Sequence, residues 1–373
     1  MKIAVLKETA AGETRVAASA ETVKKYIGLG ATVFVEAGAG VTANVSDADF
    51  EAAGATIGHR DGAIKDADIL LGVQGPDPKK LKGVKAGAWL VASLDPFGQR
   101  ARIDEYAAAG LEALAMEFMP RITRAQSMDI LSSQSNLSGY KAVVDAAGTY
   151  GRAFPMMMTA AGTVSAAKAF IMGVGVAGLQ AIATARRLGA QVSATDVRSA
   201  TKEQIESLGA KAIFVENVAG IEGEGAGGYA TEMSDEYKAA QAELVSAHIA
   251  KQDIVITTAL IPGRAAPRLV SDAQIATMKP GSVIFDLAAA QGGNVEGSIP
   301  DQIVIRHGVK IMGYSNTPAH LAADASALYA RNLFNFLNAF WDKEAGRPVL
   351  DEEIGGAIRL THGGKVVSER LLG

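Results

Sequence analysis

Short apolar and β-branched runs alternate with helix-like patterns along most of the chain. Five runs precede residue 120 and five follow it: KIAVL, ATVFVE, DILLGV, AWLVAS and LEALAM, then KAFIMG, QVSATD, KAIFV, DIVITT and SVIFDL. Such alternation is typical of parallel sheets covered by helices. The sequence therefore predicts an α/β fold with two doubly wound, mainly parallel-sheet, Rossmann-like domains of five strands each. We expect a ligand-binding cleft between them.

Two helical segments mark where the chain passes between these domains. Leu137, Tyr140 and Ala147 fall at helical spacing after the polar run SSQSN, which indicates a helix leading out of the first domain. A second helical pattern, at 322–341, follows the last strand of the second set and carries the chain back. We therefore predict a split first domain, 1–135 plus 322–373, and a second domain, 136–321.

The composition removes several kinds of site. The chain has no cysteine, which excludes disulfides, thiolate nucleophiles and cysteine-ligated zinc or iron–sulfur centres. Its 36 basic and 40 acidic residues give a net charge of −4 without a basic stripe, so we expect no nucleic-acid partner. The opening MKIAVLKE reads as a strand instead of a signal peptide, and no run approaches the ~18 apolar residues of a membrane span. We expect a cytoplasmic protein without a metal site.

A glycine pattern directly between a strand and a helix predicts a dinucleotide site. Gly173, Gly175 and Gly178 form G-x-G-x-x-G, which needs a tight turn, close approach of a pyrophosphate and close helix–strand contact, in that order. Asp196 ends the next strand, where a carboxylate accepts hydrogen bonds from the adenosine ribose and repels a 2′-phosphate. Arg198 leaves NADP(H) open as an alternative, but the acid at the strand end favours NAD(H).

Further contacts are expected where later strands of the same sheet end. The run TTALIPG places Thr258 to Leu260 and Ile261 against the adenine or ribose, and DLAAAQGGN places Asp286, Leu287 and Ala288 near the nicotinamide. Ordinary strand-to-helix connections remain the alternative, especially for Thr258. The candidate cofactor-binding residues are Gly173, Gly175, Val176, Ala177, Gly178, Asp196, Val197, Arg198, Thr258, Ala259, Leu260, Asp286 and Leu287.

The segment 217–234 is rich in glycine and has no apolar period, which indicates a long surface loop. Tyr229 lies within it. An aromatic side chain between glycines can close over a ligand, so the loop is either a mobile lid or a plain solvated connection.

Motifs spread over 1–340 resemble one family. KETAAGETRVA, RAQSMDILSSQSNLSGYKAV, FPMMMTAAGT, GVGVAGLQAIATARRLGA, TDVR, GGYATEM, TTALIPG, MKPGSVIFDLA and ASALYARNL together resemble the NAD(H)-binding alpha subunit of proton-translocating nicotinamide nucleotide transhydrogenase. RAQSMD and GGYATEM are specific to that family, whereas the glycine motif is shared with the related alanine dehydrogenases and many other proteins.

The resemblance implies a role for the polar segment 121–132. In that family the matching loop holds the nicotinamide end of the cofactor. Carried over by position, Arg121 donates to the dinucleotide, Asp129 and Ser132 bind the carboxamide, and Gln126 faces the partner nucleotide. Tyr229 matches the tyrosine of the family's mobile loop. An aspartate acceptor and a hydroxyl donor suit a carboxamide, although a cluster of helix caps at Ser132 or Ser133 is the alternative.

The resemblance also implies partners. Hydride passes between NAD(H) on this chain and NADP(H) on a partner domain, while a membrane-spanning subunit translocates protons. This chain is then a homodimer, peripheral on the cytoplasmic side of the inner membrane through its partners, and its end at residue 373 favours a separate subunit.

Two other functions stay open. An alanine-dehydrogenase-like enzyme shares the opening KE…RVA pattern and keeps Arg15 for a carboxylate, unless Arg15 pairs with Glu8 or Glu13 on the surface. The sequence departs from that family at Gln74, Asp95 and Ala290, where the family has a lysine, a histidine and an aspartate. Of the five histidines only His320 is expected near the cleft. A nucleotide-sensing protein that binds NAD without chemistry is the third alternative.

Overall fold

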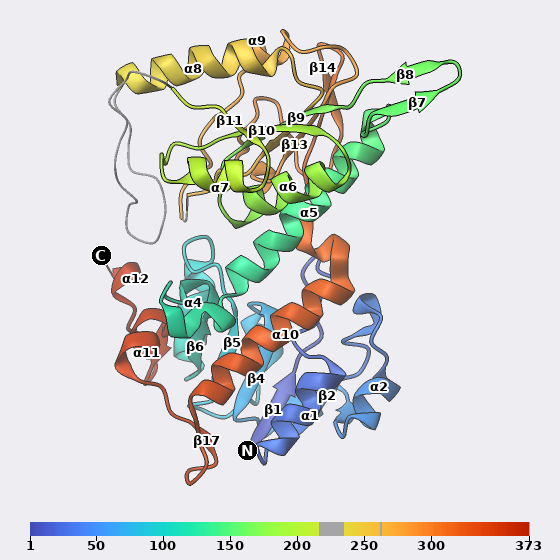
Figure 1. Ribbon diagram of the computed structural model, residues 1–373. Helices are drawn as coiled ribbons and strands as arrows, with labels where there is room; N and C mark the ends of the chain where they lie inside the picture. Colours follow the sequence, from blue (N-terminus) through green and yellow to red (C-terminus); the bar gives the residue numbers. More distant parts are fainter. Residues whose placement is uncertain (216–234, 262, 373) are drawn as a thin grey trace. The chain divides into compact units, whose positions relative to one another are not determined.

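The computed structural model describes residues 1–215, 235–261 and 263–372. The chain divides into two compact units: unit 1 comprises Met1–Gln134 and Ala319–Gly373, and unit 2 comprises Ser135–Pro318. Each unit is built on its own α/β sheet (Figure 1). The predicted fold class, with two Rossmann-like domains, is confirmed.

Unit 1 contains a six-stranded parallel sheet in the order β3-β2-β1-β4-β5-β6. Its strands are β1 (Lys2–Val5), β2 (Thr32–Glu36), β3 (Thr56–Gly58), β4 (Ile69–Gln74), β5 (Trp89–Ser93) and β6 (Glu112–Ala115). Helices cover both faces, so central strands are apolar throughout, and the first five of six residues of β4 are buried. The order reverses between β1 and β4, which pair in parallel.

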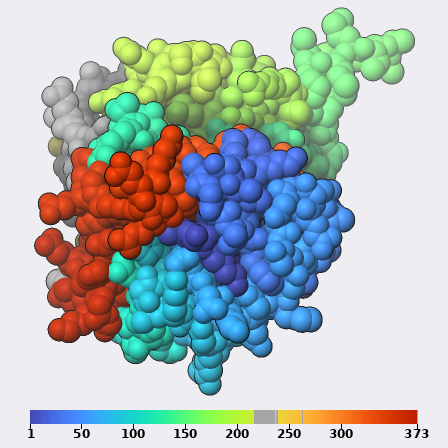
Figure 2. Space-filling view, turned by 90° about the horizontal axis from the view of Figure 1, so that it is seen from below, coloured from blue at the N-terminus to red at the C-terminus, as the bar shows by residue number. Residues whose placement is uncertain are grey.

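The helices of unit 1 come from both ends of the chain. They are α1 (Ala20–Gly28), α2 (Asp47–Ala52), α3 (Arg60–Ile64), α4 (Arg100–Ala108), α10 (Ala322–Ala339), α11 (Glu352–Ile358) and α12 (Glu369–Leu372), with short 3₁₀ turns η1 (Val41–Ala43), η2 (Pro78–Leu81), η3 (Met116–Phe118) and η4 (Thr123–Met128). Tyr26 of α1 packs edge-on against Phe334 of α10, with ring centroids 5.4 Å apart. In Figure 2 the C-terminal segment of the chain (red) accordingly lies beside the N-terminal segment (blue).

Two small hairpins complete unit 1. They are β16 (Trp341–Asp342) with β17 (Arg347–Pro348), and β18 (Thr361–His362) with β19 (Lys365–Val366). The Thr361 hydroxyl donates to the Leu111 carbonyl beside β6, and Leu114 of β6 bridges to Arg359. The C-terminal tail is therefore joined to the sheet edge.

Unit 2 contains a seven-stranded sheet in the order β11-β10-β9-β12-β13-β15-β14. Its strands are β9 (Lys168–Met172), β10 (Gln191–Thr195), β11 (Lys211–Ala212), β12 (Ile254–Thr257), β13 (Val283–Asp286), β14 (Val304–Arg306) and β15 (Val309–Met312). All are parallel except β14, which runs antiparallel to β15. The order of the first three strands and the reversal between β9 and β12 repeat the plan of unit 1.

The helices of unit 2 are α6 (Val176–Arg187), α7 (Thr201–Ser207), α8 (Asp235–Ile249) and α9 (Asp272–Ile275), with 3₁₀ turns η5 (Ala289–Gln291) and η6 (Thr317–Leu321), the latter running into unit 1. The long helix α5 (Ile130–Tyr150) starts in unit 1 and continues through unit 2. A hairpin, β7 (Met157–Thr159) and β8 (Gly162–Val164), projects from unit 2 (Figure 1). Across the three described stretches of the chain, no helix is both long enough and apolar enough to cross a bilayer.

The ten predicted strands are all present, but the count of five per sheet is wrong. Unit 1 gains β3, which is only three residues long and too short to show a period. Unit 2 gains the hairpin β14–β15, whose turn carries His307 and Gly308 at φ values of +51° and +79°. Two adjacent residues at positive φ are typical of a tight hairpin turn. The polar run SSQSN also lies inside α5, not before it.

Candidate functional site

The turn between β9 and α6 leaves no room for side chains at two of its three glycines. Gly173 has φ +97°, and a Cβ there would lie 2.5 Å from the Thr258 Oγ1. A Cβ at Gly178 would lie 1.9 Å from the Gly173 carbonyl oxygen, because α6 packs closely on the turn. Sterics therefore require glycine at both positions, as the sequence pattern predicts.

The middle glycine is different, because the space beside it is open. Gly175 is the N-cap residue of α6, with no side chain capping the helix, and a Cβ built on it would meet nothing within 4 Å. The N–H groups of the first helical turn, from Val176 and Ala177, are thus available to an external acceptor. An uncapped helix start with an unobstructed approach fits a pyrophosphate, and the helix dipole favours its charge.

Asp196 joins this turn to the end of β10. Its carboxylate is 8% exposed and accepts the N–H of Val174 at 2.7 Å, which fixes the glycine turn against the neighbouring strand. The same carboxylate binds the Arg198 guanidinium, with the Arg198 Nε 2.9 Å from Oδ1 and Nη2 3.1 Å from Oδ2. Val197 between them is half-buried. Arg198 therefore offsets part of the charge that the sequence assigns to Asp196.

The loops after β12 and β13 are tied together by one buried amide. The Asn294 side chain, fully buried, accepts from the Ala259 N–H and donates to the carbonyls of Ala259 and Pro267. Thr258 supports the glycine turn, because its hydroxyl donates to the Gly173 carbonyl at 3.0 Å. Leu260 and Ile261 are each 42% exposed, so apolar surface is available beside the turn.

Asp286 ends β13 with no exposed surface. Its carboxylate accepts from the Thr257 hydroxyl and from the N–H groups of Ala288, Asn294 and Val295. These four bonds hold the loop that follows β13, whose Leu287 is half-buried. No sequence pattern indicated this clamp. A cofactor contact by Asp286 or Leu287 stays a prediction.

The polar segment 121–132 is anchored to unit 1 by residues outside the sequence prediction. The Arg124 guanidinium binds Asp351 (Nη1 to Oδ2, 2.6 Å) and Glu353, both at the start of α11. The side-chain amides of Asn332 and Asn335 on α10 donate to the Ser127 carbonyl. These contacts fix η4 on the surface of unit 1, and their sequence separation of more than 200 residues hid them.

Within this segment, Asp129 and Ser132 are brought together. The Asp129 carboxylate accepts the Ser132 N–H at 3.0 Å and the Ser132 hydroxyl at 2.6 Å, a helix cap at the start of α5. The cap residue is Asp129, not Ser132 or Ser133. Arg121 and Gln126 are exposed. Tyr229 and the whole predicted loop 217–234 lie outside the described residues.

Arg15 is buried and paired, not on the surface. It is 6% exposed and binds the Glu13 carboxylate through Nε at 2.8 Å and Nη2 at 2.7 Å. Its Nη1 donates to the Gln134 side chain on α5 at 2.8 Å, and Gln74 donates to Glu13. Three sides of this guanidinium are therefore used within unit 1.

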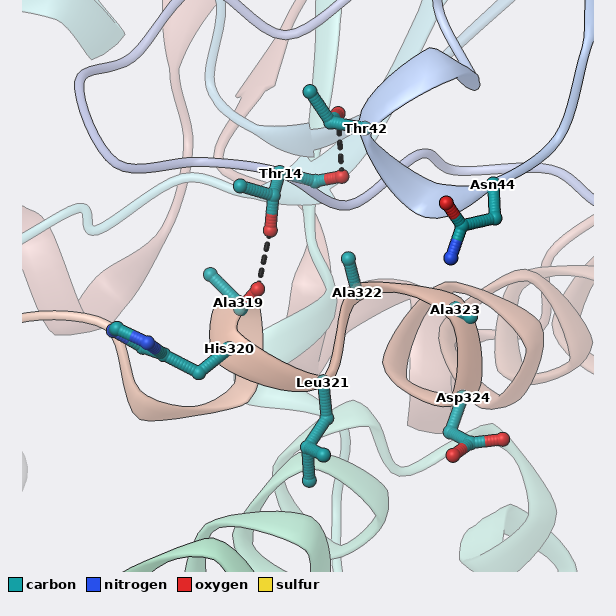
Figure 3. A pocket seen from close by; sticks show the side chains of 9 residues that line it. All are labelled: Thr14, Thr42, Asn44, Ala319, His320, Leu321, Ala322, Ala323 and Asp324. Carbon is teal, nitrogen blue, oxygen red and sulfur yellow. Dashed lines mark hydrogen bonds between the residues drawn. The ribbon is translucent and has the colours of Figure 1, made fainter. Parts of the chain in front are cut away.

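Two pockets lie in unit 1. The larger, about 400 Å³, is lined by residues 319–324 at the start of α10 with Thr14, Thr42 and Asn44 (Figure 3). The Thr14 and Thr42 hydroxyls donate to the carbonyls of Ala319 and Thr14. It contains none of the expected site residues except His320. The smaller, about 240 Å³, is lined by residues 6–10, 74–77, 80 and 102, and we call it the β1–β4 pocket.

The chain matches two family domains and several characterised proteins over nearly all of its length. The alanine dehydrogenase/PNT N-terminal domain matches 4–138 and the C-terminal domain matches 142–369. An NAD(P) transhydrogenase subunit alpha of Rhodospirillum rubrum is 52% identical, over 100% of this chain and 99% of its own length. A crystal structure of transhydrogenase from Sinorhizobium meliloti is 52% identical with a TM-score of 0.90, covering 98% of this chain and 100% of its own. An L-alanine dehydrogenase structure shares the fold, at 24% identity and a TM-score of 0.82 over 100% and 98% of the two chains.

Proposed function

The chain belongs to the alanine dehydrogenase/PNT family, and from that premise we propose that it is the NAD(H)-binding subunit of an NAD(P) transhydrogenase. The observation that carries the proposal is the open glycine turn joined to Asp196 through Val174. The 52% identity to a transhydrogenase alpha subunit over the full length of both chains supports the choice of enzyme.

Unit 2 holds the dinucleotide in this proposal. The N–H groups at the start of α6 bind the pyrophosphate, because Gly175 leaves their approach open. Asp196 retains lone pairs for the adenosine ribose hydroxyls after accepting from Val174 and Arg198. The exposed Leu260 and Ile261 form an apolar wall for the adenine. When bound, the nicotinamide ring donates or accepts the hydride.

The segment 121–132 orients the ring and faces the partner. Arg121 donates to the dinucleotide, Asp129 and Ser132 hold the carboxamide, and Gln126 faces the partner nucleotide. The Asp129–Ser132 cap supports this, since the carboxylate keeps acceptor capacity and stays fixed in direction. Tyr229 closes over the ligand. Hydride transfer requires position and exclusion of water more than acid–base groups.

The proposed partners follow from the same assignment. NADP(H) sits on a separate domain, a membrane-spanning subunit translocates protons, and this chain acts as a homodimer on the cytoplasmic side of the inner membrane. The transhydrogenase relatives are each named as one subunit of an enzyme, which supports a multi-subunit assembly.

An alanine-dehydrogenase-like activity is the weaker candidate. It needs a cation for the substrate carboxylate, yet Arg15 is engaged by Glu13 and Gln134. It also needs an acid–base group, and Gln74 donates to Glu13 instead of standing where a lysine would act.

A reconstitution assay tests the proposal. The purified chain is mixed with a separately produced NADP(H)-binding domain of a transhydrogenase, and NADH oxidation by bound NADP⁺ is followed in a single turnover. We expect hydride transfer that requires both proteins. Failure to transfer, together with turnover of alanine or pyruvate by the chain alone, would refute the transhydrogenase assignment.

A further inference from the structure

The β1–β4 pocket occupies the topological switch point of unit 1. In the order β3-β2-β1-β4-β5-β6 the chain runs outward in one direction from β1 and in the other from β4. The pocket is lined by residues that directly follow these two strands, which lie side by side in the sheet (Figure 1). Open α/β sheets bind ligands in the crevice at this point, outside the carboxyl ends of the strands.

The pocket wall carries cations without ionic partners. Lys7, Lys80 and Arg102 line it, and none of them forms a salt bridge with any residue in the described ranges. Arg102 is half-buried, and its Nη1 donates to the Gly75 carbonyl at 2.9 Å, which fixes the guanidinium at the pocket. By contrast, Arg60 of the same unit binds Glu36 at 2.9 Å.

The two acids in the wall are turned to the backbone. Glu8 accepts the N–H of Val73 at 2.6 Å and that of Gln74 at 3.3 Å, and Asp77 accepts the N–H of Lys79 at 3.0 Å. Burial raises the pKa of Glu8 to about 7, so near neutral pH this carboxyl carries a proton in much of the population. The titratable groups around Glu8 are Glu13 and Arg15 of its own loop, Tyr106 of α4 and Tyr329 of α10. The positive charge of the pocket is therefore not cancelled by its acids.

We propose that the β1–β4 pocket is a second ligand site, which binds a small oxyanion, a phosphate or a short carboxylate, between Arg102 and Lys80. The planar guanidinium offers paired donors to such an anion, and the ammonium adds a point charge. A volume of about 240 Å³ admits a molecule of only a few heavy atoms. The site lies wholly in unit 1, so it goes beyond the proposed function and does not depend on it.

The test uses the two tryptophans, Trp89 and Trp341, which both belong to unit 1. Thermal unfolding of the full-length protein is followed by tryptophan fluorescence at pH 6.5 in increasing inorganic phosphate, and separately in malonate, with sodium chloride holding the ionic strength constant. A ligand that binds the folded state raises the midpoint in a saturable way. We expect such a rise with at least one anion, and the anion that gives it identifies the ligand class as phosphate or carboxylate.

Variants locate the effect. Lys80→Gln and Arg102→Gln should each weaken the anion roughly tenfold or more, because each removes a charged hydrogen bond. Lys80 is exposed, so its variant keeps the fold even if Arg102→Gln does not. Lys79→Gln, which changes the exposed neighbour outside the pocket, should respond like wild type. No saturable rise with either anion, or the same rise in Lys80→Gln as in wild type, would overturn the proposal.

Discussion

The switch points of the two units share one topology and differ in chemistry. In unit 2 the chain leaves β9 through glycines, and the next strand contributes a threonine that closes on the turn. In unit 1 the chain leaves β1 through Lys7 and Glu8, and the carboxylate of Glu8 accepts the N–H groups at the end of β4. The same space is thus open to a backbone-bound pyrophosphate in unit 2 and is walled by charged side chains in unit 1.

This difference shows that strand order locates a site without deciding its ligand. The ligand class follows from the residues directly after the strands, since these decide whether N–H groups or side chains face the crevice. The following predictions test whether the two switch points differ in the way their residues indicate.

The largest effect is expected at Gly178. A Cβ there would lie 1.9 Å from the Gly173 carbonyl oxygen, so Gly178→Ala must push α6 away from the turn. We expect unit 2 to lose about 3 kcal/mol or more of stability, the upper range for overpacking, and NADH binding to be abolished. Urea unfolding followed by circular dichroism and NADH fluorescence titration measure the two effects.

Two other glycines serve as controls for that variant. Gly175→Ala meets nothing within 4 Å, so it should keep full stability yet weaken NADH roughly tenfold or more by obstructing the pyrophosphate. Gly148→Ala, in α5 and also without close neighbours, should leave NADH affinity unchanged and stabilise the helix by about 0.5–1 kcal/mol. Normal NADH affinity in Gly178→Ala would show that the turn is not the nucleotide site.

The second prediction concerns Glu8. Its pKa rises from 4.5 to about 7 on folding because of burial, so the folded protein binds its proton more tightly than the unfolded chain does. Its contribution is complete below pH 4.5 and is lost as the pH rises to about 7, a change of about 3 kcal/mol. Glu8→Gln keeps an acceptor for the Val73 N–H and should flatten this part of the stability profile. Tryptophan-detected unfolding of unit 1 at pH 5 and pH 7.5 measures it.

Glu51→Gln, on the exposed surface of α2, is the matched control and should keep the wild-type profile. Some of the slope will remain in both variants, because burial also raises the pKa of Glu117 to about 6. An unchanged profile in Glu8→Gln would mean that Glu8 is ionised in the folded protein throughout this range.

The third prediction separates the two roles of Asp129. Asparagine is also a good helix cap, so Asp129→Asn should preserve stability, whereas Asp129→Ala should lose about 1 kcal/mol with the cap. If the carboxylate orients the nicotinamide, Asp129→Asn should slow single-turnover hydride transfer by roughly a hundredfold, the effect expected of a misplaced reactant. A wild-type transfer rate in Asp129→Asn would reduce the residue to a cap.

The sequence predicted what depends on local pattern. The ten strands followed from apolar runs, and the glycine turn followed from a spacing with strict steric causes. It could not predict the Thr258–Gly173 bond, which joins residues 85 apart, or the Arg15–Gln134 bond, across 119 residues. Such contacts arise when separate elements pack. The short strand β3 was missed because three residues show no period.

A smaller effect is expected at Thr258. Thr258→Val keeps the side-chain shape but loses the hydrogen bond to the Gly173 carbonyl, which should cost about 1 kcal/mol of stability and weaken NADH a few-fold. Thr163→Val, on the exposed hairpin strand β8, should change neither quantity. Equal NADH affinity in both variants would show that the glycine turn holds its shape without Thr258.

The most direct test of the account is a titration of the wild-type protein with NADH and with NADPH, repeated for Asp196→Ala. Asp196 lies at the end of β10, bound to Val174 and Arg198, where a 2′-phosphate would face a carboxylate. We predict that NADH binds at least tenfold more tightly than NADPH, because like charges in a buried site cost several kcal/mol, and that Asp196→Ala narrows this difference. Equal affinities of the wild-type protein for the two nucleotides would contradict the assignment of unit 2 as an NAD(H) site.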